Sequence, residues 1–150
     1  MLNSSATAAE IKNDPAYNAE VVANHFKNMT DKQFEDTQFK SILKLVKDST
    51  HARLITKWSE ESDRKTLGYT YVEMSTTDLR NAISKIDIPV LILGSTYGTK
   101  EMSQKMLSDE YAQLRDKFIL IAPARHFIMY DDPVWFREEV KNFLLNGLAN

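Results

Sequence analysis

Two short apolar runs in the second half of the chain constrain the fold most strongly. Residues 86–94 read IDIPVLILG, and their apolar character is continuous rather than alternating from Ile88 to Leu93. Residues 118–123 read FILIAP. Runs of this kind are typical of strands buried on both faces, as in parallel sheets. A polar loop at 95–99 and a helical segment around 100–114 separate them, so we predict a βαβ unit with parallel strands and a right-handed crossover.

The end of the chain predicts one further helix. Asp132-Pro133 fits an N-cap followed by proline at the first helical position. The buried face of this helix should then carry four apolar residues, Phe136, Val140, Phe143 and Leu144.

Residues 1 to about 85 are expected to be helical throughout. Thr7-x-x-Glu10 and Thr30-x-x-Gln33 both have the spacing of a capping box, in which two side chains satisfy free N–H groups at a helix start. Pro15 should separate a first segment from a helix at 16–29. The clearest amphipathic pattern comes next, with Phe39, Ile42, Leu43 and Val46 at the spacing of one helical face.

Two more helical segments follow, at 51–62 and 63–74. They carry regularly spaced apolar and aromatic residues, namely Leu54, Ile55, Trp58, Tyr69, Tyr71, Val72 and Met74. Such residues form either core or the lining of a pocket, and core is the commoner role. The predicted fold class is therefore α/β, with a mostly helical part at 1–80 followed by a short parallel β-α-β-α unit at 81–150.

Composition excludes several classes of function. With 19 basic and 21 acidic residues in 150, the chain has no field that would attract nucleic acid or an anionic membrane. No apolar run approaches the length of a membrane span, and the first residues do not resemble a signal peptide, so we expect a soluble protein of unassigned compartment.

Metal and cofactor binding also have little support in the sequence. Cysteine is absent, and the three histidines, His25, His51 and His126, are far apart in sequence. None of the four glycines lies in a phosphate-binding pattern. We therefore predict neither a metal nor a cofactor.

His126 is the strongest candidate for a chemical role. It lies three residues beyond the second apolar run, and catalytic groups collect at the carboxyl ends of strands in open α/β sheets. It is either a general base or a structural residue that hydrogen-bonds its loop or caps the next helix. Its position in the sequence leaves both roles open.

The sequence also resembles a known family over about residues 76–146. The stretches ISKIDIPVLILGS and FILIAPARHFIMYDDPVWFREEVKNFLLN are similar to the C-terminal end of α/β-hydrolases. In that family a PVLxLxG strand precedes the acid loop, and HFxMxDxP carries the catalytic histidine. The segment TTDLR at 76–80 also looks like one often found ahead of that strand, although we expect it to be a helix start.

This resemblance implies a partial α/β-hydrolase fold, with a helical cap before residue 81, and a serine hydrolase that cleaves ester or acyl bonds. His126 would deprotonate the serine and later protonate the leaving group. Phe127, Met129 and Pro133 would support its loop. Glu101, the first carboxylate after Gly94, is a candidate acid, although a glutamate is also favourable at any helix start.

The 150 residues contain no G-x-S-x-G nucleophile motif. The resemblance therefore implies a truncated portion that is inactive alone and acts on a small ester-type substrate only when the missing half is supplied. The alternative is a non-catalytic helical α/β module. In either case a two-stranded parallel sheet exposes its edges. We expect self-association across a two-fold axis, a complementing chain, or helices that fold back over the sheet.

Overall fold

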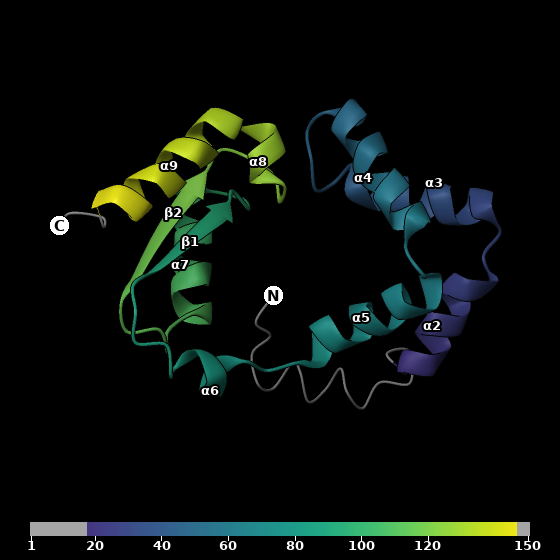
Figure 1. Ribbon diagram of the computed structural model, residues 1–150, viewed down its shortest axis with the longest axis horizontal. Coiled ribbons are helices and arrows are strands. Elements are labelled where there is room, and N and C mark those ends of the chain that lie inside the picture. The colour runs from purple at the N-terminus through teal and green to yellow at the C-terminus, as the bar shows by residue number, and fades with distance from the viewer. Residues whose placement is uncertain (1–17, 147–150) are drawn as a thin grey trace. The chain divides into compact units, whose positions relative to one another are not determined.

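The computed structural model describes residues 18–146, and this part of the chain is mostly helical with a small two-stranded parallel sheet (Figure 1). It divides into two compact units, one formed by 18–42 and 52–79 and the other by 43–51 and 80–146. The segment 43–51 thus belongs with the sheet-containing unit. The expected capping box at Thr7 and the break at Pro15 lie outside the described residues.

Among the described residues four helices form the first unit, and side chains next to them satisfy their first N–H groups. The helices are α2 (Ala19–Asn28), α3 (Asp31–Ile42), α4 (Ser49–Glu61), which enters this unit at residue 52, and α5 (Arg64–Thr76). The predicted capping box is confirmed at α3, because Thr30 N donates to Gln33 Oε1 at 2.9 Å and Gln33 N donates to Thr30 Oγ1 at 3.3 Å. Asp63 caps α5 by accepting from Thr66 N at 2.7 Å.

The core of this unit forms where α5 approaches α2 and where aromatic rings meet. Ala23 and Phe34 are fully buried. The Phe26 ring contacts Phe34 edge-to-face at 6.0 Å and Tyr71 at 5.5 Å between centroids. The predicted core role of the apolar residues in 51–62 and 63–74 is confirmed only in part. Ile55 and Val72 are buried, but four others are substantially exposed, namely Leu54, Trp58, Tyr71 and Met74.

Helix α3 ends at Ile42, so the predicted helical face that continued to Val46 is wrong. Residues 43–45 form a turn, and Val46 is fully buried in the loop that follows. In a continued helix Lys47 N would donate to Leu43 O. Lys47 N donates instead to Asp131 Oδ1 at 2.7 Å, a residue 84 positions away in sequence. A long-range bond has therefore replaced the local one.

The second unit holds the sheet and the C-terminal helices. Its elements are α6 (Arg80–Ile83), β1 (Val90–Ser95), α7 (Lys100–Glu110), β2 (Lys117–Ala122), α8 (Ile128–Asp131) and α9 (Pro133–Asn146). β1 and β2 pair in parallel, from Val90 opposite Lys117 to Ser95 opposite Ala122, which confirms the predicted parallel pair. β1 begins directly after Pro89, where the missing N–H is tolerated.

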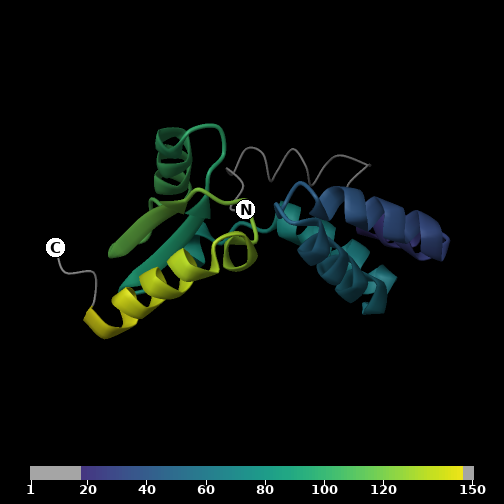
Figure 2. The ribbon, with the colours of Figure 1, turned by 90° about the horizontal axis from the view of Figure 1, so that it is seen from above.

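Among the described residues α7 packs on one face of the sheet and α9 on the other, and neither face is fully covered. A Cβ added to Gly94 would lie 2.3 Å from Leu107 Cδ1 of α7, so this face meets α7. Phe118 contacts Phe143 of α9 at 6.1 Å, and Figure 2 shows the strands running between the two helices. The predicted cap of α9 is confirmed, since Trp135 N donates to Asp132 Oδ1 at 3.1 Å. The predicted burial of Leu144 is wrong, because its side chain is 73% exposed.

The sheet itself is only partly buried. The central apolar residues of both strands, 91–93 and 118–120, are of intermediate exposure, and burial becomes complete only toward the carboxyl ends of the strands. In the described part of the chain neither strand has a second neighbour. Membership of a larger α/β-hydrolase sheet stays a prediction. Across residues 18–146 there is no helix with both the length and the apolar character required to cross a membrane.

Candidate functional site

His126 lies in the loop between β2 and α8, beyond the carboxyl end of the parallel sheet. Its side chain is exposed, and its ring contacts Phe127 at 5.3 Å with the ring planes nearly perpendicular. Within residues 18–146 no hydrogen bond or ion pair involves the imidazole. It also caps no helix, because Phe127 is the N-cap residue of α8 and Asp132 caps α9. Within residues 18–146 neither of the two structural roles considered for His126, a hydrogen bond to its loop and a helix cap, is observed.

The backbone on both sides of His126 is held by hydrogen bonds. Arg125 N donates to Asp131 Oδ2 at 2.7 Å, and Phe127 N donates to Leu45 O at 3.0 Å. Leu45, the acceptor of the second bond, lies in the segment 43–48 and precedes Phe127 by 82 positions in the sequence. The loop thus has a restrained backbone, and the exposed imidazole makes no hydrogen bond or ion pair with residues 18–146.

Three side chains complete this junction between the two segments. The Arg125 guanidinium donates through Nη1 to Leu43 O at 2.6 Å and to Val46 O at 2.9 Å. Lys47 Nζ donates to Pro123 O at 2.6 Å. The Asp131 carboxylate accepts from both segments, through Oδ1 from Lys47 N and through Oδ2 from Arg125 N. We call these contacts between 43–48 and 123–131 the loop junction.

Glu101 is exposed in the first turn of α7 and has the bonding of a helix-start carboxylate. Its own backbone N–H and then the Thr99 hydroxyl hold the pKa of the Glu101 carboxyl below its usual value. Among the described side chains no ion pair or hydrogen bond joins Glu101 to His126. Its role as the triad acid stays a prediction.

His51 is a second imidazole of the same unit. Its Nδ1 lies 3.6 Å from Asp48 Oδ1, and its ring lies over Tyr130 at 4.7 Å between centroids. Within the described residues the Nδ1 atom is buried without a hydrogen-bond partner, and Asp48 Oδ1 accepts from Thr50 N and His51 N. These bonds, led by that from His51 N, lower the pKa of Asp48. Asp48 therefore acts here as the carboxylate at the start of α4.

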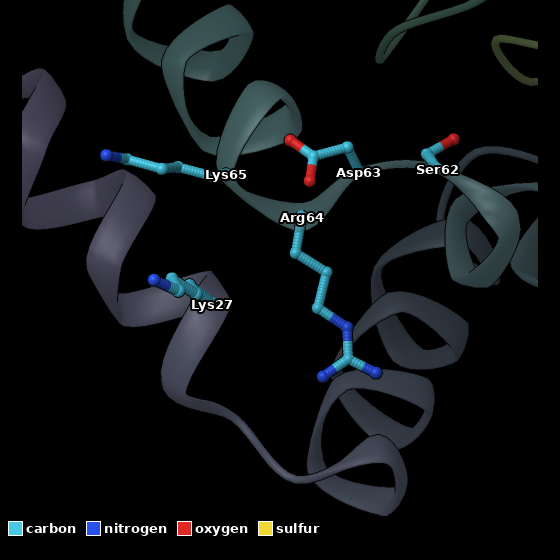
Figure 3. A pocket seen from close by; sticks show the side chains of 5 residues that line it. All are labelled: Lys27, Ser62, Asp63, Arg64 and Lys65. Carbon is cyan, nitrogen blue, oxygen red and sulfur yellow. The ribbon is translucent and has the colours of Figure 1, made fainter.

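A hollow of about 480 Å³ in the first unit is lined by basic and small polar residues, which are Lys27, Ser62, Asp63, Arg64 and Lys65 (Figure 3). Its charges are largely satisfied within the unit. Arg64 donates to Met29 O at 2.8 Å and to Asp31 Oδ1 at 2.6 Å. Lys65 pairs with Glu20 at 3.5 Å. These contacts join α5 to its neighbours, and the hollow contains none of the residues predicted for catalysis.

No three His, Asp or Glu side chains of residues 18–146 are grouped so that they could hold a metal ion. Comparison with protein-family models, with curated proteins and with solved structures finds no match.

Sequence reasoning found His126 but missed the loop junction. Arg125 and Asp131 flank the histidine in the sequence, yet no local pattern identifies 43–48 as their partner. That segment was assigned to a helical face. The polar breaks around Lys47 and Asp48 were the available signal that the helix ends there.

Proposed function

We propose that this chain carries the histidine-bearing end and a helical, cap-like part of a serine hydrolase site for ester or acyl bonds. In this proposal His126 is the general base. The nucleophile comes from another polypeptide, because the 150 residues contain no G-x-S-x-G motif, and the chain alone is inactive. Glu101 is the candidate acid within the chain, and the alternative is an acid supplied together with the nucleophile. The observation that carries the proposal is the exposed imidazole, without a hydrogen bond or ion pair to residues 18–146, on a fixed loop beyond the carboxyl end of β2.

The proposal also rests on the resemblance at HFIMYDDP and PVLILG described above. A general base that has neither an orienting carboxylate nor a nucleophile within reach contributes little to covalent catalysis. The half-buried strands are consistent with further strands being added, because continuous apolar strands are normally covered on both faces and paired at both edges.

Ester hydrolysis tests the first part. The chain, His126→Ala and the matched control His25→Ala, which alters an exposed histidine of α2, are compared on p-nitrophenyl acetate. We expect equal background rates from all three. A rate above background that is lost only in His126→Ala would show that the chain has its own nucleophile and would overturn the claim that it is inactive alone.

Complementation tests the second part. A polypeptide with a G-x-S-x-G motif, encoded directly upstream or copurifying with the chain, is treated with a fluorophosphonate probe that labels activated serines. We expect labelling to rise when the chain is added and not when His126→Ala is added. Labelling that is the same with both chains would count against the general-base role of His126.

The open sheet edges favour a second candidate, a non-catalytic module that self-associates. Neither β1 nor β2 has another strand neighbour in residues 18–146, and Ile88, directly before β1, is 65% exposed. Light scattering at micromolar concentration should then give a dimer mass that Ile88→Lys lowers. Leu144→Lys, at a 73% exposed position of α9, is the matched control. A compact monomer would exclude this candidate.

A further inference from the structure

The loop junction is held together by several side-chain hydrogen bonds. Five side-chain bonds, with donor–acceptor distances of 2.6–2.9 Å, join 43–48 to 123–131 or close the histidine loop on itself. Each of the five has an ionised donor or acceptor, and charge-assisted bonds of this length are the stronger kind. They hold two segments of one compact unit together although about 80 residues separate them in sequence.

The contacts of the loop junction include backbone groups on both sides of His126. Within residues 18–146 no hydrogen bond reaches the His126 side chain. The N–H groups of its two neighbours, Arg125 and Phe127, are both used. On the strand side, Thr96 of the loop after β1 ties down the same region, since its hydroxyl donates to Ala122 O at 2.7 Å and its N–H donates to Ala124 O at 3.2 Å. The Cα of His126 is thus restrained from both directions.

Asp131 is the residue on which this arrangement depends. Its two carboxylate oxygens accept from two different segments, so the loop on one side and 43–48 on the other share one anionic acceptor. An amide at this position has only one acceptor oxygen and cannot accept both N–H groups in the same way. The adjacent Asp132 has a different task, the cap of α9.

We infer that Asp131 and Arg125 are positioning residues that fix the backbone from which the His126 imidazole projects, and that they do so by bonding to the segment 43–48. This inference rests on the proposed function, in which His126 is the reacting imidazole. It adds a part of the site that lies in the first third of the chain. Pre-orientation of a catalytic group matters because displacements near 1 Å reduce rates strongly.

The test compares Asp131→Asn with the matched control Asp132→Asn in the full chain, by NMR of the His126 imidazole and by amide hydrogen exchange. In Asp131→Asn the amides of Lys47, Arg125 and Phe127 should exchange about ten- to a hundredfold faster, the range expected for lost bonds to a charged group. The His126 resonances should shift, and its reaction with diethyl pyrocarbonate should change. In Asp132→Asn only the start of α9 should respond.

Milder variants keep the test decisive if Asp131→Asn does not fold. Lys47→Met removes only the bond to Pro123 O and should accelerate Arg125 amide exchange and move the His126 resonances by a smaller amount. Arg125→Lys should restore part of what Arg125→Ala disturbs, because an ammonium can still donate to a carbonyl of 43–48. Unchanged His126 spectra in these variants, or equal changes in Asp132→Asn, would overturn the inference.

These readouts need no substrate, so they separate the two claims. The His126 resonances could shift in Asp131→Asn while the chain fails to raise labelling of a serine nucleophile. That result would contradict the proposed function and would leave the loop junction with a structural role only. Complementation that Asp131→Asn leaves intact would remove the positioning role and leave the proposed function standing.

Discussion

Gly68 gives the sharpest test of how the first unit is packed. Glycine in a helix interior costs about 1 kcal/mol relative to alanine, so Gly68→Ala would stabilise an isolated α5. In the structure, however, a Cβ at this position would lie 2.5 Å from Ala23 Cα and 2.9 Å from Ala23 N. These are backbone atoms of α2, so the whole helix must move to relieve the contact.

The magnitude follows from the two opposing effects. Overpacking against an element that must shift costs up to about 3 kcal/mol, and the helix-propensity gain of about 1 kcal/mol offsets part of it. We expect Gly68→Ala to lower the free energy of unfolding by about 2 kcal/mol. For a unit of this size the midpoint of thermal unfolding should fall by about 10 °C.

The assay is thermal unfolding followed by circular dichroism at 222 nm. Thr70→Ala, at an exposed position of the same helix, should change stability by no more than about 0.5 kcal/mol. Adding Ala23→Gly to Gly68→Ala should not restore stability, because the close atoms belong to the α2 backbone rather than to the Ala23 side chain. A midpoint that rises in Gly68→Ala would refute this account of the packing.

Three further variants have definite expected outcomes. Gly94→Ala should lower the free energy of unfolding, measured by chemical denaturation, by about 1 kcal/mol, because the new Cβ meets Leu107 Cδ1, a flexible side-chain end that can shift. The double variant with Leu107→Val should lose less stability than the sum of the two single variants. Glu20→Gln should flatten the acid limb of the stability–pH curve. The Tyr69 hydroxyl lowers the pKa of Glu20, so the stabilisation is present above the ordinary pKa of about 4.3 and is lost as pH falls through the lower folded value; an unchanged acid limb would contradict this. Thr30→Ala removes half of the capping box at α3 and should lower the free energy of unfolding by about 1 kcal/mol. Urea unfolding measures this loss, and unchanged stability would mean that the cap is not formed in solution.

The loop junction shows why part of the candidate site was beyond sequence reasoning. His126 was identified because a histidine after an apolar run is a local signal. Lys47 and Asp131 carry no such signal, because their contact joins residues 84 positions apart. The same contact explains why the pattern from Phe39 to Val46 gave a wrong helix end.

The sequence by itself determined the features that depend on near neighbours. Continuous apolar residues predicted both strands. Their parallel pairing followed instead from the helical segment between them, because a βαβ connection joins parallel strands. Thr30 with Gln33, and Asp132 with Pro133, predicted two helix starts, because a cap involves atoms no more than three residues apart.

Only the tertiary structure decided which apolar residues are covered and which polar groups meet. Val46 is buried in a loop while Leu144 of α9 is 73% exposed, although helical periodicity predicted that both would lie on the buried face of a helix. Periodicity describes one element at a time, whereas burial and long-range hydrogen bonds depend on which surfaces another element reaches. The restrained backbone beside His126 is of this second kind, since 43–48 and Asp131 hold the loop only after the chain has folded.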